Sequence, residues 1–193
     1  MPPKVKISKQ DIIQTAVDLI RKSGEDSVNA RSIATALNCS TQPIFSNFSS
    51  MEELQEEVIY SAYCLYTEFL QEECKSSKYP KYKAFGMAYI RFAGEERELF
   101  KLLFMRDRSG GESMDFSPDF DQSVQMIMHA NSITEEKARL IHLEMWIFVH
   151  GIATMLATSF LSLEWDLVSD MQTDAYKGII ARHTSEENEN DRN

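Results

Sequence analysis

One stretch of the sequence decides the fold of its N-terminal part, namely Asn29-Ala-Arg-Ser-Ile-Ala-Thr-Ala-Leu-Asn-Cys-Ser-Thr-Gln-Pro-Ile-Phe-Ser-Asn-Phe48. Asn29 suits the N-cap of a short helix over about 29–37, and Asn38 suits a turn residue with positive φ. Ser40 suits the cap of a second helix over about 41–47, whose first turn tolerates Pro43. Two short helices joined by such a turn are typical of a helix-turn-helix.

Helical periodicity continues on both sides of this stretch. Before it, a capping pattern at Ser8 opens a helix that ends at Gly24. After it, apolar residues recur with helical spacing over about 51–74, 81–94, 96–106, 118–130, 134–161 and 166–183. The most loop-like segment is 108–113, and strand patterns are scarce. The sequence therefore predicts an all-α fold with about nine helices.

The charges divide the chain into two parts of opposite sign. Residues 1–50 hold six basic and four acidic residues, a net charge of +2, whereas the remainder holds fourteen basic and twenty-six acidic residues, a net charge of −12. Carboxylates repel phosphate, so any nucleic-acid contact should be confined to the N-terminal part. We expect a helix-turn-helix domain over 1–50, a helical regulatory and dimerisation domain over 51–184, and a disordered tail over 185–193.

The second helix of the motif has an apolar side and a polar side. Ile44 and Phe48 should face inward with Ile33, Ala34 and Leu37, which leaves short polar and amide side chains outside. Such groups suit base edges in the major groove, and the residues predicted to read bases are Thr41, Gln42 and Ser46. Those predicted to contact phosphate are Lys4, Lys6, Lys9, Arg31, Ser40 and Asn47. An ordinary solvated polar face is the alternative.

Residues 8–58 resemble the tetracycline-repressor (TetR) family of bacterial regulators. The matching features are Ile33-Ala34, the turn at Asn38-Cys39-Ser40, the aromatic pair Phe45 and Phe48, and Glu52-Glu53-Leu54. Asn38 replaces a common glycine, Phe45 a common tyrosine and Met51 a common lysine, so two phosphate contacts of the family are missing. The resemblance implies a homodimer that binds a palindromic double-stranded DNA operator, and we expect it to act as a repressor.

Further along the chain, Trp146-Ile-Phe-Val-His150-Gly151 resembles a signature of the ligand-binding domain in some of these regulators. Trp146 and His150 would lie one helical turn apart on the same face. Methionine and aromatic residues nearby could line a pocket for a small apolar effector that releases DNA. The pocket candidates are Phe92, Phe100, Leu103, Phe104, Met126, Trp146 and His150. A structural role for His150 in the core remains open.

The sequence also bears on compartment and on membrane contact. Residues 140–163 are long and largely apolar, but Glu144 and two histidines interrupt them and no basic cluster flanks them. A buried helix is therefore favoured over a membrane span. The three cysteines are odd in number and widely spaced, and no secretory signal pattern is visible, so we expect a cytoplasmic protein with reduced thiols.

Two other functions were weighed against DNA binding. Histidines at metal-binding spacing, a glycine-rich phosphate loop and a readable Ser-His-Asp arrangement are all missing from the sequence. We therefore expect no enzyme activity, no metal and no cofactor. A family member that acts as a protein-binding co-regulator without DNA is the other alternative. The sequence does not reveal the operator, the effector or the target genes.

Overall fold

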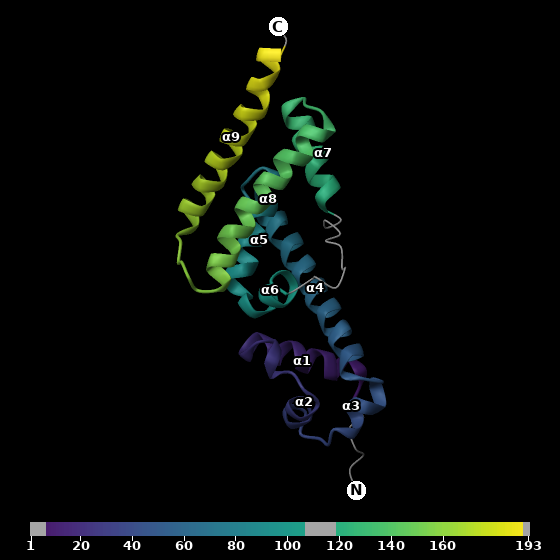
Figure 1. Cartoon of the computed structure of the whole chain (residues 1–193). Coiled ribbons are helices and arrows are strands. Elements are labelled where there is room, and N and C mark those ends of the chain that lie inside the picture. The colour runs from purple at the N-terminus through teal and green to yellow at the C-terminus, as the bar shows by residue number, and fades with distance from the viewer. Residues whose placement is uncertain (1–6, 107–118, 191–193) are drawn as a thin grey trace. The chain divides into compact units, whose positions relative to one another are not determined.

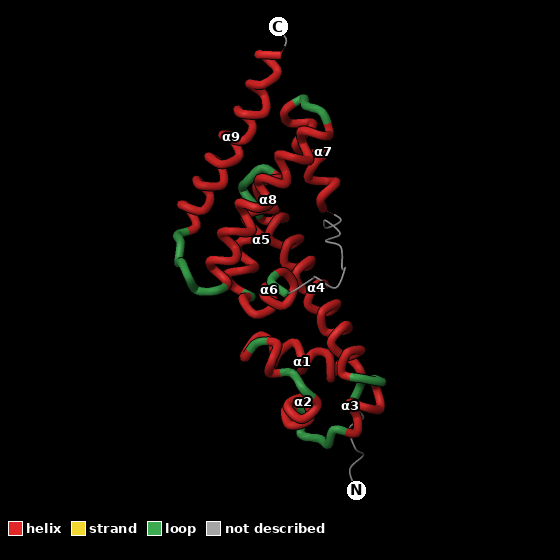
Figure 2. Tube along the Cα trace, in the orientation of Figure 1, coloured by secondary structure: helices red, strands yellow, loops and turns green. Residues whose placement is uncertain are grey.

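The computed structural model describes residues 7–106 and 119–190, with side chains up to residue 184. Within these residues the chain forms nine α-helices and one short 3-10 helix, and no strand (Figures 1 and 2). The predicted all-α fold is confirmed. The predicted loop at 108–113 lies outside the described residues.

The contacts divide the chain into two compact units. Unit 1 comprises Met1–Phe69 and Glu95–Arg106, and unit 2 comprises Leu70–Gly94 and Asp107–Asn193. The long helix α4, Met51–Ser76, contributes residues to both units. This division differs from a cut at residue 50, because the first part of α4 and a later helix group with the helix-turn-helix. The functional domain limits at 50 and 184 stay predictions.

Unit 1 is built around its first helix. It contains α1 (Lys9–Ser23), the 3-10 turn η1 (Glu25–Ser27), α2 (Ala30–Ala36), α3 (Gln42–Asn47), the start of α4, and α6 (Arg97–Phe104). The predicted capping box is present, since Ser8 Oγ accepts from the amide of Asp11 at 3.1 Å and the Asp11 carboxylate accepts from the amide of Ser8 at 2.8 Å. Gly24, with φ of 80°, ends the helix as expected.

The apolar stripe of α1 forms the centre of the unit 1 core. Ile12, Val17 and Ile20 are fully or almost fully buried. They share this core with Ile33 of α2 and Ile44 of α3, because α1 packs against α2, α3 and α6. Burial of this kind is the main favourable term in folding, so α1 fixes where the two short helices lie.

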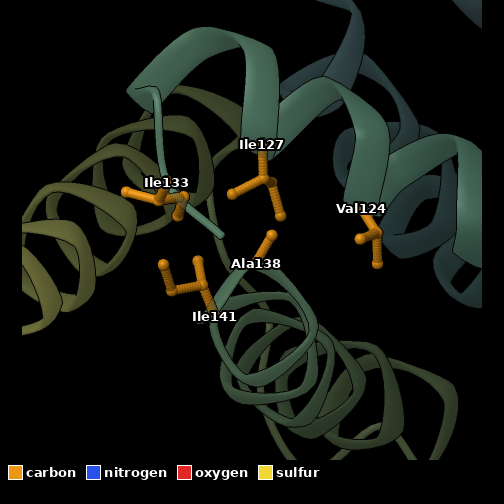
Figure 3. Close-up of a cluster of buried hydrophobic side chains, with 5 residues drawn as sticks. All are labelled: Val124, Ile127, Ile133, Ala138 and Ile141. Carbon is orange, nitrogen blue, oxygen red and sulfur yellow. The ribbon is translucent and has the colours of Figure 1, made fainter. Parts of the chain in front are cut away.

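Unit 2 contains α5 (Lys81–Glu95, except for its last residue), α7 (Asp119–Asn131), α8 (Glu135–Ala157) and α9 (Trp165–Asn190). Both α7 and α9 pack against α8. Figure 3 shows part of the core, a cluster formed by Val124, Ile127, Ile133, Ala138 and Ile141. Ala138 is small and lies among isoleucines, which lets the first turns of α8 approach α7 closely.

One helix in the described part of the chain, α8, has the length and hydropathy of a membrane span. The core helix of a soluble protein passes the same test, and α8 is covered by α7 on one side and α9 on another. Ala138, Ile141 and Met145 are buried along this helix. Part of its apolar composition therefore serves packing within unit 2, whereas Leu140, Ile147 and Met155 of the same helix are exposed.

The last helix is longer than the sequence predicted. Instead of ending near residue 183, α9 continues to Asn190, so residues 185–190 are helical where a disordered tail was expected. A polar segment cannot form a hydrophobic core of its own. It can still extend a helix that is already nucleated and packed, because propagation needs no further burial. The segment also contains neither glycine nor proline to interrupt the helix. Residues 191–193 lie outside the described part.

Candidate nucleic-acid interface

The first short helix of the motif begins at the predicted cap. Oδ1 of Asn29 accepts from the backbone amides of Arg31 and Ser32, each at 3.0 Å. In return, Ser32 Oγ accepts from the amide of Asn29 at 3.0 Å. These reciprocal bonds satisfy amides that the first helical turn leaves without partners. The start of α2 is therefore fixed by its own sequence.

The turn between α2 and α3 has the conformation that the sequence predicted. Asn38 has a φ of 52°, in the left-handed region, and its amide donates to the carbonyl of Thr35 at 3.1 Å. The amide of Cys39 donates to the carbonyl of Ala34 at 2.9 Å. Asparagine tolerates this backbone better than most residues, so it can replace the usual glycine.

The start of α3 differs from the prediction. Ser40 does not cap the helix; the N-cap position is Thr41, and its side chain makes no capping bond. The reason is the backbone, because Thr41 already has a helical conformation with φ of −72° and ψ of −11°, which aims its hydroxyl away from the first turn. Pro43 lies in the first turn as expected.

The inner and outer sides of α3 are distinct. Ile44 and Phe48 are buried as predicted, whereas Gln42 and Ser46 are exposed. Ser46 Oγ donates its proton to the carbonyl of Gln42 at 2.9 Å, so that the hydroxyl offers lone pairs only. The Gln42 amide offers both donor and acceptor, which is the combination that matches the edge of adenine. Thr41 is half-buried at the margin of this surface.

The residues predicted to contact phosphate are differently placed. Arg31 and Ser40 are exposed beside the motif, and Asn47 is half-buried. One N–H of Asn47 Nδ2 donates to the carbonyl of Pro43 at 2.7 Å, which leaves the other N–H for a further acceptor. Lys4 and Lys6 lie outside the described residues.

Lys9 has a structural partner that the sequence did not suggest. Its Nζ donates to Glu57 at 2.6 Å, lies 3.9 Å from Glu53, and stands 5.1 Å from the ring centroid of Phe48. The hydrogen bond to Glu57 and the two negative charges raise the pKa of Lys9 above its ordinary value. A phosphate would have to compete with these carboxylates for the ammonium group, so Lys9 is better placed to hold α1 against α4.

A second ion pair holds the other end of α1. The guanidinium of Arg21 makes a two-pronged contact with Glu96, with both N–O distances at 2.9 Å. This fork geometry orients a pair more strictly than a single bond does. The partners are 75 residues apart in sequence. Sequence periodicity reports only neighbours within a helix, so it could not have revealed either this positioning pair or Lys9–Glu57.

In unit 2, Trp146 and His150 lie on one face of α8 as predicted. Their rings stack at 5.0 Å with an interplanar angle of 10°. Nδ1 of His150 is 2.9 Å from the hydroxyl of Tyr89 on α5, and burial lowers the pKa of His150. His150 is thus a half-buried residue that links α8 to α5 through Tyr89, and its place in a ligand pocket stays a prediction.

The other pocket candidates do not form one described group. Phe92 is buried in unit 2 and Met126 is half-buried there. Phe100, Leu103 and Phe104 belong to unit 1, where Phe100 and Phe104 lie 5.1 Å apart between ring centroids. A ligand pocket made by these residues stays a prediction.

Comparisons with known proteins bear on this architecture. Residues 82–175 match the family model described as "Tetracyclin repressor-like, C-terminal domain". Over these residues, just under half of the chain, the protein is similar to the C-terminal domain of the tetracycline-repressor (TetR) family. This match runs from α5 into the first part of α9, whereas the motif resemblance concerns residues 8–58, so the two observations come from different parts of the sequence. A comparison with curated protein sequences gave no match.

Solved structures extend the TetR likeness to almost the whole fold. A TetR-like transcriptional regulator from Rhodococcus sp. RHA1 has 17% identity and a TM-score of 0.66, with 94% of this chain and 98% of that chain covered. A protein of unknown function from the same organism has 20% identity and a TM-score of 0.70, with 92% and 97% covered. A Vibrio parahaemolyticus protein described as a candidate TetR-family regulator has 15% identity and a TM-score of 0.61, with 88% and 97% covered. At these identities the likeness shows the TetR fold.

Proposed function

We propose that this chain is a transcriptional regulator that binds duplex DNA through α2, the turn and α3. The observation that carries the proposal is the two-sided α3, which buries Ile44 and Phe48 and exposes Gln42 and Ser46. A helix whose apolar side is packed against the rest of its domain can enter the major groove with its polar side toward the bases. We assign base reading to Thr41, Gln42 and Ser46.

Phosphate contacts are assigned to the residues around this face. Arg31 and Ser40 are exposed, and Asn47 keeps one free N–H. Lys4, Lys6 and Lys9 complete the set because of their positive charge in the N-terminal part of the chain, although a phosphate at Lys9 would compete with Glu57. Such contacts set register and affinity without reading sequence.

We further propose that the regulator is a homodimer, formed through α8 and α9. Ile147 of α8 is 58% exposed, and Leu140 of α8 and Leu167 of α9 are exposed too. Gly151 of α8 and Gly178 of α9 have open space where a Cβ would stand, so another helix could approach both closely. An isologous dimer requires a palindromic operator, with half-sites roughly 34–36 Å apart.

We propose that a small apolar effector regulates the dimer in the cytoplasm. Effector binding releases the DNA, so transcription is repressed only while the effector is absent. Phe92, Met126, Trp146 and His150 are the residues of unit 2 assigned to its pocket. An effector lowers DNA affinity only when it binds the DNA-incompetent state more tightly than the competent one. Helix α4 is the expected connection, because it is the one continuous segment that begins beside the motif and ends in unit 2.

Selection of operators from random duplexes tests DNA binding. The wild type should enrich a palindrome, and Gln42→Ala should change the preference at particular base pairs by roughly 1–3 kcal/mol. Gln125→Ala is the matched control, since Gln125 is exposed on α7 in unit 2. Arg31→Ala should weaken all sequences alike and lower the salt slope by about one. If no sequence is enriched, the protein-binding alternative replaces this proposal.

Sedimentation and fluorescence test the remaining parts. A monomer at micromolar concentration would contradict the dimer. A panel of hydrophobic compounds should contain some that change Trp146 fluorescence and weaken operator binding together. If compounds change the fluorescence and leave operator binding unchanged, the effector proposal is wrong.

A further inference from the structure

An apolar ring stands in the middle of the polar surface of α3. Phe45 is 55% exposed, while the adjacent Ile44 and the next aromatic residue, Phe48, are buried. Its neighbours on the surface are Thr41, Gln42 and Ser46, none of which is apolar. More than half of the Phe45 side chain is therefore open to solvent and available for a contact outside the chain.

The register of α3 places Phe45 within the surface assigned to base reading. An α-helix turns by about 100° per residue, so with Ile44 as the origin Thr41 lies near 60°, Phe45 near 100°, Gln42 near 160° and Ser46 near 200°. Phe45 therefore lies between Thr41 and Gln42 around the helix axis. A groove edge that meets both of those side chains must also meet the ring.

We propose that Phe45 is a specificity-determining residue that contacts the 5-methyl group of a thymine in each operator half-site. This inference rests on the proposed function, because it needs α3 in the major groove. A phenyl ring can neither donate nor accept a hydrogen bond, and the thymine methyl is the apolar group that base pairs present in that groove. Any other base there leaves a polar edge against the ring without a partner, so the half-site carries thymine at this position.

The chemistry of the ring also separates this contact from one with the DNA backbone. A tyrosine in this place could donate a hydrogen bond to phosphate, whereas phenylalanine has no donor. The polar groups near it, Thr41 and Gln42, remain available for the adjacent base pairs. The operator should thus combine a methyl-dependent position with neighbouring positions that depend on hydrogen bonds.

The test replaces single thymines of the selected operator by deoxyuridine, which removes only the methyl group. Burying one methyl gives about a fourfold gain in affinity, so deoxyuridine at the contacted position should weaken wild-type binding about fourfold for each half-site. Phe45→Ala should bind both operators equally. Phe45→Tyr keeps the ring and should keep the methyl dependence. Tyr60→Ala is the matched control, because Tyr60 is a 67% exposed aromatic residue on α4 outside the motif.

The outcomes are distinguishable. A methyl effect that is present in the wild type and lost in Phe45→Ala supports the inference. If no thymine position behaves this way, or if Phe45→Ala weakens every sequence equally, the ring contacts the sugar-phosphate backbone and the inference is overturned. If the wild type selects no operator at all, the proposed function itself fails, and the inference fails with it. Circular dichroism of Phe45→Ala should match the wild type, since the side chain is outside the core.

Discussion

Gly86→Ala tests whether the packing between α5 and α9 is as tight as the structure indicates. A Cβ at this position would clash with Nε2 of Gln172 and stand 3.5 Å from a methyl carbon of Val149. Gln172 is only 3% exposed, so its amide would have to rearrange within the packed region to make room. The φ of Gly86 lies outside the left-handed region, so the backbone does not require glycine. The reason for glycine here is the lack of space for a Cβ.

The magnitude follows from two opposing effects. Replacing a glycine inside a helix by alanine is worth roughly 0.5–1 kcal/mol in favour of folding. Overpacking a tight core costs roughly 1–3 kcal/mol. Gly94→Ala in the same helix separates the two, because its Cβ would meet only the edge of Trp165, at the ordinary distance of 3.6 Å. Gly86→Ala should therefore be less stable than Gly94→Ala by about 1–3 kcal/mol.

Urea unfolding at a fixed protein concentration measures this difference. The double variant Gly86→Ala/Gln172→Ala should recover part of the loss relative to the sum of the single changes, with a coupling of at least about 0.5 kcal/mol. If Gly86→Ala proves as stable as Gly94→Ala, the close approach between Gly86 and Gln172 does not constrain the fold. Additive single effects would show instead that the cost arises at another contact.

Three further results are expected. Asn29→Ala should destabilise the fold by about 1 kcal/mol in chemical unfolding, because it removes the cap of α2; an unchanged midpoint would contradict this. A double-mutant cycle with Arg21→Gln and Glu96→Gln should give a coupling of about 0.5–1 kcal/mol that shrinks as salt is added, and a salt-independent coupling would count against the ion pair. Burial lowers the pKa of His142 from 6.5 to about 4, so the unfolded chain binds this proton first, and stability should fall as the pH drops from about 6.5 toward 4. His142→Gln should flatten that part of the pH profile of unfolding; an unaltered profile would assign the acid sensitivity to other groups.

Local signals in the sequence were sufficient for most of the helices. Asn29, Asn38 and Gly24 mark caps and turns through their own backbone preferences, and the structure has them where these preferences placed them. Ser40 failed as a cap because α3 begins one residue later than expected, at Gln42 with Thr41 in the N-cap position, and side-chain preference alone does not fix a helix end to one residue. The end of α9 was missed because polarity was taken as a sign of disorder, although a packed helix can continue into solvent.

The sequence predicted which side chains of α3 are buried and which are exposed, but it did not predict the partners of Lys9 and His150. Burial of Ile44 and Phe48 follows from helical spacing, which also fixes that Gln42 and Ser46 face outward. Lys9 forms an ion pair with Glu57, which is 48 residues away in the sequence, and local sequence patterns cannot predict a pairing over that separation. Likewise, the pairing of His150 with Tyr89 joins two helices 61 residues apart, so the sequence could name His150 without naming its partner.

The two ion pairs of α1 join residues that the ribosome adds at different times. A ribosome adds about 5–20 residues per second, so the 75 residues between Arg21 and Glu96 take roughly 4–15 s to make. During that interval α1 has been synthesised while one of its two carboxylate partners does not yet exist. The part of the protein that we expect to meet DNA is thus finished only after translation has passed α6. A chimaera that carries α1 to α3 of this protein would therefore also need the first part of α4 and all of α6.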